Sequence, residues 1–103
     1  MAVGPVLVFK LLRPAEWASF DLAGNFPGSP DDVRDGFIHL SAADQVDGTR
    51  AKYFAGEAVV RIAFDVAALG SELRWEVSRG GAEFPHLYRP LVRADIVAVV
   101  TVD

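Results

Sequence analysis

The chain has 103 residues, of which 51% are hydrophobic and 23% charged, and its formal net charge is −4 at pH 7. A chain of this length and composition builds one globular domain, residues 1–103, around one core. The absence of cysteine excludes disulfides, thiol catalysis and cysteine-based metal sites. The negative charge and scattered basic residues argue against nucleic-acid binding, whereas a small anionic ligand fits a chain in which eight of ten basic residues are arginine.

The N-terminal residues lack the charged and apolar regions of a signal peptide. No apolar stretch reaches the roughly 20 residues that a membrane helix needs. We therefore expect a cytoplasmic protein without a membrane contact. The oligomeric state is not predicted.

The predicted elements begin with a strand over 6–12 and a helix over 14–22, whose first turn contains Pro14. Residues 24–35 are rich in Gly, Pro and Asp, and are therefore expected to form a loop. A loop of this length is often functional, and the alternative is a surface excursion with solvated acids. A second strand is predicted over 37–40.

Ser41 and Asp44 then have the spacing of an N-cap and the third position of a helix, which predicts a helix that ends near Tyr53. The rest of the chain is mostly strand. Strands are expected at 57–65, at 73–78, around His86 after a Gly80-Gly81 turn, and at 96–102.

Along the strand at 73–78, apolar and polar residues alternate, so the apolar set is expected to face the core. This inward set is Leu73, Trp75 and Val77. The β-branched run at 96–102 is expected to be a buried strand. The order strand, helix, strand, helix and then mostly strand predicts an α+β fold: one small domain with a bent, mixed or mostly antiparallel sheet and two or three helices.

The two histidines of the chain lie in short apolar strands beside polar residues. His39 and Ser41 are two residues apart and share one strand face, and His86 shares a face with Tyr88 in the same way. His39 also precedes a predicted strand-to-helix transition, where ligands often bind. The alternative is that both histidines are half-buried structural residues and that Ser41 only caps a helix.

Two basic residues are further candidates. Lys10 interrupts an apolar strand, so its ammonium must be paired, line a cleft, or lie at a solvated edge. Arg89 could clamp a phosphate or cover the core with its aliphatic stem. Glu76 could orient a ribose hydroxyl or act as a base if it lies in a cleft. No zinc, P-loop or nucleophile-elbow motif is present, so no metal is expected.

Several segments form a pattern that extends over nearly the whole chain. They are Val8-Phe9-Lys10, Glu16-Trp17, Asp35-Gly36-Phe37-Ile38-His39-Leu40-Ser41 with Gln45, and Phe84-Pro85-His86-Leu87-Tyr88. This pattern resembles the bacterial domain-of-unknown-function family 952. The family has no established biochemical activity that could be transferred to this chain.

The segment from Phe37 to Ser41 is also similar to a His-Leu-Ser strand in the tRNA 2′-phosphotransferase branch of the ADP-ribosyltransferase-like superfamily. This more distant resemblance implies a split, bent sheet with a cleft for NAD or an ADP-ribose-like ligand. In many members a His or Arg of the first strand holds the nicotinamide ribose, and Lys10 is nearest to that position. The catalytic Glu of classical ADP-ribosyltransferases has no clear counterpart, with Glu76 and Glu83 as the available substitutes.

On this basis we expect a nucleotide-binding cleft, with NAD as the implied cofactor or co-substrate, that supports group transfer. The catalytic candidates of this cleft are His39 and His86. The ligand-binding candidates are Lys10, Ser41, Tyr88 and Arg89. In this arrangement His39 and Ser41 hold ribose hydroxyls, Tyr88 stacks on nicotinamide or a base, and Arg89 meets phosphate.

Two alternatives belong to other functional classes. The missing catalytic Glu favours a binding module that keeps the pocket without the chemistry. A protein-interaction domain with purely structural histidines is the other. Periodicity fixes the faces of strands but not the distances between them, so the sequence does not establish that the two histidines meet.

Overall fold

The structure is a computed structural model that describes residues 6–103. Its elements follow the chain in this order: β1 (Leu7–Leu12), α1 (Pro14–Ala23), β2 (Asn25–Phe26), α2 (Pro30–Asp35), β3 (Ile38–His39), β4 (Ser41–Ala42), α3 (Val46–Tyr53), β5 (Val59–Asp65), α4 (Val66–Leu69), η1 (Gly70–Glu72), β6 (Leu73–Val77), η2 (Arg79–Gly81), β7 (Glu83–Leu87), β8 (Leu91–Val92), η3 (Arg93–Asp95) and β9 (Ile96–Val102).

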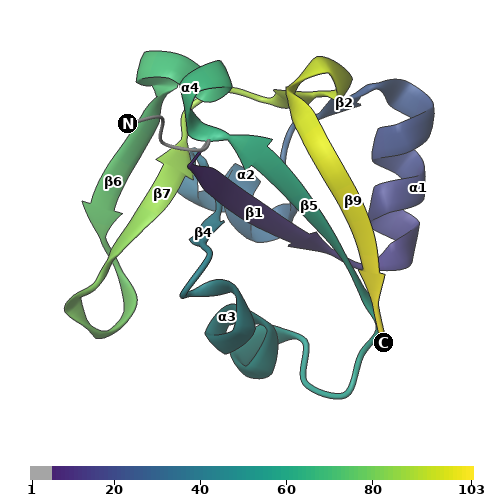
Figure 1. Cartoon of the computed structure of the whole chain (residues 1–103), viewed down its shortest axis with the longest axis horizontal. Helices are drawn as coiled ribbons and strands as arrows, with labels where there is room; N and C mark the ends of the chain where they lie inside the picture. Colours follow the sequence, from purple (N-terminus) through teal and green to yellow (C-terminus); the bar gives the residue numbers. More distant parts are fainter. Residues whose placement is uncertain (1–5) are drawn as a thin grey trace, which may run out of the picture.

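The strands of residues 6–103 pair antiparallel throughout and form three sheets. Their strand orders are β4-β1-β5-β9, β3-β7-β6 and β2-β8. In Figure 1 the β6–β7 hairpin lies to the left of the four-stranded sheet and α1 to its right, and both pack against the same face of it; α3 lies near one end of the sheet. The predicted α+β class with mostly antiparallel strands is confirmed, and the described part of the chain contains four α-helices in place of the two or three expected.

A single extended run, residues 38–42, belongs to two of these sheets. Its first part, β3, pairs with β7, and its last part, β4, pairs with β1. Leu40 lies between them, and its backbone N–H donates to the carbonyl of Pro85 at 3.0 Å. The chain therefore bends from one sheet into the next directly between His39 and Ser41.

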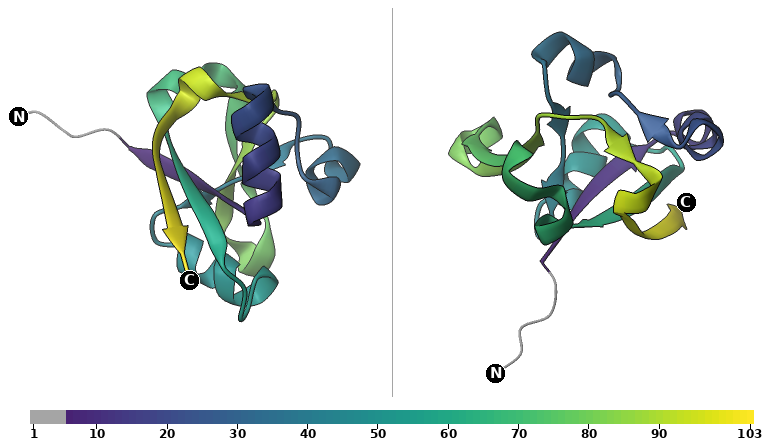
Figure 2. Two further views of the ribbon diagram at one scale, coloured as in Figure 1. Left: turned by 90° about the vertical axis from the view of Figure 1, so that its right-hand side faces the viewer. Right: turned by 90° about the horizontal axis from the view of Figure 1, so that it is seen from above.

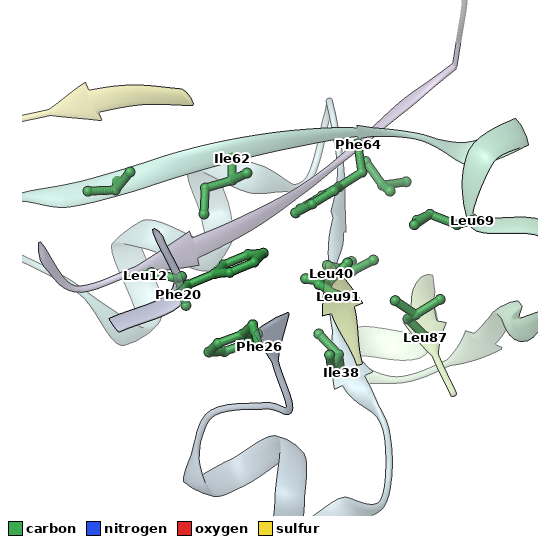
Figure 3. Close-up of a cluster of buried hydrophobic side chains, with 12 residues drawn as sticks. Leu12, Phe20, Phe26, Ile38, Leu40, Ile62, Phe64, Leu69, Leu87 and Leu91 are labelled. Atoms are coloured by element: carbon green, nitrogen blue, oxygen red, sulfur yellow. The ribbon is translucent and has the colours of Figure 1, made fainter. Parts of the chain in front are cut away.

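The main core fills the space enclosed by the sheets and α1. It contains Val8, Leu12, Phe20, Phe26, Ile38, Leu40, Val60, Ile62, Phe64, Leu69, Leu87 and Leu91. Figure 3 shows these side chains meeting from β1, α1, β2, β3, β5, α4, β7 and β8. A smaller cluster lies under α3, where Val46 packs with Leu11 and Val59.

The predicted loop over 24–35 is wrong, because the segment contains β2 and α2. The sequence does carry the signature of the helix: Ser29 stands at the N-cap, Pro30 at the first helical position and Asp32 at the third. The Asp32 carboxylate accepts the Ser29 backbone N–H at 2.8 Å. The helix projects from the body of the molecule (Figure 2).

The predicted helix start at Ser41 is also wrong. Ser41 lies in β4 and pairs with Phe9 of β1, and α3 begins only at Val46. Pairing with β1 keeps the Ser41 backbone extended, and its hydroxyl lies 2.8 Å from that of Thr49 instead of capping a helix. Gln45 makes the turn, since its side-chain oxygen accepts the backbone N–H of Ala42 at 3.0 Å.

Two predictions of burial are corrected as well. Trp75 is 40% exposed and Val77 is 69% exposed, although both were expected in the core. They lie on β6, which is the edge strand of a three-stranded sheet. The run at 96–102 does form β9, but it is an edge strand with mostly exposed side chains.

No helix in residues 6–103 is both long enough and apolar enough to span a bilayer.

Candidate functional site

The two histidines face each other on neighbouring strands. His39 of β3 and His86 of β7 are paired in register, and their ring centroids lie 5.6 Å apart. The ring of Phe37 covers both, at 4.0 Å from His86 and 4.6 Å from His39. The sequence could not decide whether these rings meet, and the strand register brings them together.

Asp32, the third residue of α2, is the centre of the hydrogen-bond network. Its Oδ1 lies 2.6 Å from Nδ1 of His39 and accepts the His39 backbone N–H at 3.0 Å. Its Oδ2 lies 2.9 Å from Nζ of Lys10. Lys10 also donates to the His39 carbonyl at 3.0 Å. Helix α2 thus holds Nδ1 and the backbone N–H of His39 through the carboxylate of Asp32.

Asp32 is only 2% exposed, and its environment favours the ionised form. Burial by itself raises the pKa of this carboxyl. The His39 side chain, the charge of Lys10, and the backbone N–H groups of His39 and Ser29 together outweigh burial and hold the pKa well below its usual range. Lys10 is therefore buried beside a carboxylate on an interior strand, and the solvated-edge alternative does not apply.

The second nitrogen of His39 faces another carboxylate. Nε2 lies 3.0 Å from Oδ2 of Asp35, the last residue of α2, and Arg34 holds the same carboxylate through two further contacts. The hydrogen bond from Arg34 is the main reason why the pKa of Asp35 is lowered. His39 can donate to both carboxylates only as the doubly protonated ring.

Gly36 lets the backbone turn sharply between Asp35 and Phe37. It ends α2 with a φ of 84°, and its N–H donates to the Asp32 carbonyl at 2.9 Å. This left-handed conformation suits glycine and turns the chain from Asp35 to Phe37 within one residue. Asp35, which contacts His39, and Phe37, which stacks on both histidines, therefore belong to one short segment.

His86 has its own carboxylate. Its Nδ1 lies 2.8 Å from Oε1 of Glu76, and the Tyr88 hydroxyl donates to the same oxygen at 2.6 Å. The hydrogen bonds from Tyr88 and then His86 lower the pKa of Glu76, and the bond to Glu76 raises the pKa of Tyr88. The site thus contains two imidazoles, each oriented at Nδ1 by a carboxylate.

A cavity of about 460 Å³ lies at the junction of the two sheets. This volume is within the range of roughly 300–1,000 Å³ typical of small-molecule sites. Four of the six predicted site residues line it: Lys10, His39, Ser41 and His86. Its wall also includes Asp32 and Asp35 and the aromatic residues Phe9, Tyr53, Phe54 and Phe84.

The cationic side chains of the cavity are paired with carboxylates. Lys10 lies 2.9 Å from Asp32, Arg34 lies 2.8 Å from Asp35, and Arg13 contacts Glu57 at 2.9 Å. Each of these three charges is already partnered by a carboxylate, so it attracts a phosphate less strongly than an unpaired cation would. The wall as built therefore suits hydroxyl groups better than phosphate.

Tyr88 and Arg89 do not line the cavity. Tyr88 binds Glu76 behind His86, and the guanidinium of Arg74 lies 4.7 Å from the centre of its ring. Arg89 forms two hydrogen bonds with the buried Asp95, at 2.8 and 3.1 Å. Arg89 thereby joins the end of β7 to η3, which is a structural arrangement.

Replacing Arg89 with alanine is expected to lower the free energy of unfolding by about 1.5–3 kcal/mol, because it leaves a buried carboxylate without its cationic partner. Arg89→Lys keeps the charge but loses the paired geometry, so its effect should be intermediate. Urea denaturation measures both. Unchanged stability of Arg89→Ala would contradict a structural role for the pair.

Sequence reasoning missed three residues of the site. Asp32 and Asp35 fell in the presumed loop, although the capping signature of α2 would have indicated Asp32 as a structured carboxylate. Phe37 is part of the pattern that resembles the family, but its contact with both histidines depends on the pairing of β3 with β7. Residues 6–103 contain no cluster of three His, Asp or Glu side chains arranged to hold a metal.

The fold and the cavity define a small α+β protein in which two antiparallel sheets meet at a pocket lined by two histidines. Residues 11–99 match the family described as "Protein of unknown function (DUF952)". The chain belongs to this family, and the resemblance seen in the sequence is confirmed to that extent.

Solved structures of the protein CC0527 from Caulobacter crescentus are similar to this chain. A crystal structure has 48% sequence identity and a TM-score of 0.90, covering 94% of this chain and 86% of CC0527. A solution NMR structure has 48% identity and a TM-score of 0.82, covering 91% and 82%. A search of curated proteins found no match. These comparisons do not show the ADP-ribosyltransferase-like relationship, which stays a prediction.

Proposed function

We propose that the cavity binds the ribose portion of an NAD- or ADP-ribose-type nucleotide and supports transfer of the ribosyl group. The observation that carries this proposal is the joint placement of His39, His86 and Ser41 on one cavity, with each imidazole oriented by a carboxylate. Oriented imidazoles are suited to hydrogen bonding with sugar hydroxyls and to proton transfer. Because the cations of the cavity wall are already paired with carboxylates, the cavity suits the ribose of such a nucleotide better than its phosphates.

In the proposed reaction, an acceptor attacks C1′ of the nicotinamide ribose, and water is the simplest acceptor. The bond from C1′ to the nicotinamide nitrogen breaks, and its electron pair leaves with nicotinamide. The proton of the acceptor passes to solvent or to a ring nitrogen of the site. His39, with Lys10 and Asp32 behind it, and Ser41 would hold the ribose, and His86 would contact the sugar beside them.

A binding module without transfer is the second candidate, and one observation favours it. Glu76 and Glu83 were the available substitutes for a catalytic Glu, and neither lines the cavity. Glu76 is also engaged by His86 and Tyr88. A cavity bordered by both histidines weighs against the third candidate, in which they are purely structural.

Thermal unfolding with NAD, ADP-ribose, nicotinamide and phosphorylated nucleotides tests the proposal. A ligand at 100 times its dissociation constant is expected to stabilise the protein by roughly 2.7 kcal/mol, which raises Tm by several degrees. The rise should vanish in His39→Ala. Because that variant also disturbs Asp32, Ser41→Ala is the second test, with the exposed Ser71→Ala as its matched control.

Release of nicotinamide from NAD, followed by chromatography, then separates the two candidates. Release that is lost in His39→Ala supports group transfer. Binding without release identifies the binding module. No stabilisation by any nucleotide overturns the proposal as a whole.

A further inference from the structure

His86 differs from His39 in the surroundings of its second ring nitrogen. Nε2 of His39 faces Asp35, whereas Nε2 of His86 is buried without a hydrogen-bond partner among the described residues. His86 is 4% exposed, is one of the residues that line the cavity, and stacks against the ring of Phe37. Buried nitrogens are nearly always hydrogen-bonded, so an unpaired one beside a cavity indicates a place for a ligand atom.

Glu76 determines which nitrogen of His86 carries the proton. Its Oε1 accepts from the Tyr88 hydroxyl at 2.6 Å and lies 2.8 Å from Nδ1 of His86. An ionised carboxylate can only accept hydrogen bonds, so Nδ1 must donate. In the neutral ring Nε2 then carries a lone pair. A second proton on the ring would place an N–H against a buried surface that offers it no acceptor.

We propose that Glu76, supported by Tyr88, fixes His86 as a hydrogen-bond acceptor, and that this acceptor selects a free hydroxyl of the ligand. The inference rests on the proposed function and adds a contact to it. One ribose hydroxyl donates to Nε2 of His86. The oxygen of the neighbouring hydroxyl accepts from Nε2 of His39 in place of Asp35. Glu76 is a positioning residue, because it acts through His86 and does not line the cavity.

The geometry agrees with a pair of adjacent hydroxyls. The two ring centroids lie 5.6 Å apart, and each ring can reach a different oxygen of one sugar through an ordinary hydrogen bond of about 2.9 Å. Asp35 is a residue of the projecting α2, and its side chain is partly exposed, so a hydroxyl can displace it. A phosphate or carboxylate oxygen at His86 would face a lone pair and be disfavoured.

The protonation pattern of the free protein is the first test. Nitrogen-15 NMR of the imidazole rings distinguishes the two neutral tautomers. Wild type is expected to carry the His86 proton on Nδ1, and Tyr88→Phe should keep it there, since Glu76 stays in place. Glu76→Ala removes the acceptor and should move protons to Nε2 in a measurable fraction of molecules. Glu83→Ala, an equal charge change on the neighbouring strand, should leave the rings unchanged.

The selection of a hydroxyl is tested with ADP-ribose and its 2″-deoxy and 3″-deoxy forms, which lack one hydroxyl of the terminal ribose each. Removal of the hydroxyl that meets His86 leaves a buried acceptor unpaired, so calorimetry should show affinity lower by roughly tenfold or more for that form. The difference should persist in Tyr88→Phe and in Glu83→Ala. It should largely disappear in Glu76→Ala.

The outcomes separate this inference from the proposed function. A wild-type His86 with its proton on Nε2, or equal affinity for all three ligands, overturns the inference while nucleotide binding stands. Absence of ADP-ribose binding overturns the proposed function and the hydroxyl contact with it. In that case the tautomer measurement still decides whether Glu76 positions His86.

Discussion

Replacing Asp32 with asparagine is expected to lower the free energy of unfolding by about 3–5 kcal/mol. The buried carboxylate accepts from Lys10, from His39 and from two backbone N–H groups, and the ammonium of Lys10 is itself buried. The amide removes the negative charge and leaves the ammonium without a counter-ion inside the protein. Chemical denaturation at pH 7 measures the loss.

The neighbouring Asp31 provides a matched control. It lies on the same helix, is well exposed, and has a single longer contact with Arg34 at 3.4 Å. Asp31→Asn makes the same change of charge and should alter stability by no more than about 0.5 kcal/mol. Equal effects of the two substitutions would contradict the central role of Asp32.

The buried pair of Asp32 and Lys10 makes the free energy of unfolding depend on pH. The pKa of Asp32 is lower in the folded protein than the value of about 3.9 expected for the unfolded chain. Its contribution is therefore fully present above about pH 4 and is lost as the pH falls toward the folded pKa. The difference in stability between wild type and Asp32→Asn should be constant near neutrality and shrink in acid.

Truncation of Phe64 to alanine is expected to cost about 3–5 kcal/mol. Phe64 is completely buried on β5, and its ring packs into the main core, as Figure 3 shows. Removal of the ring leaves a cavity that the surrounding strands cannot close, because each is held by its pairing partners. Urea or thermal denaturation measures the effect.

Val77 provides the comparison, because alternation along the strand at 73–78 predicts an inward side chain there. The structure leaves Val77 69% exposed. Val77→Ala should therefore change stability by no more than about 0.5 kcal/mol. A large loss there would mean that the outer face of β6 is covered in solution.

The different results for these two strands show what periodicity can predict. Alternation assigns the side chains of a strand to two faces, but it does not say what covers each face. For β5, one of those faces meets the main core. For β6, Trp75 and Val77 are exposed, because the strand lies at the edge of its sheet. Which face is covered depends on elements that are distant in the sequence.

The candidate site likewise contains residues that the sequence predicts and residues that it does not. Local patterns identified His39, Ser41, Lys10 and His86, and the structure brings all four to one cavity. The partners that orient them were not predictable from spacing. Asp32 reaches His39 because α2 folds back against β3, and Glu76 reaches His86 because β6 pairs with β7. Each partner is fixed by tertiary contacts, about which short segments carry no information.

The run at 38–42 connects the cavity to the mechanics of the whole fold. One hydrogen-bonded partner of this run lies in each sheet, so His39 is held from the β7 side and Ser41 from the β1 side. Any change in the angle between the sheets must alter the distance between these two side chains. The width of the pocket is therefore coupled to the packing of the entire domain, and substitutions far from the pocket that reorient the sheets will change its shape.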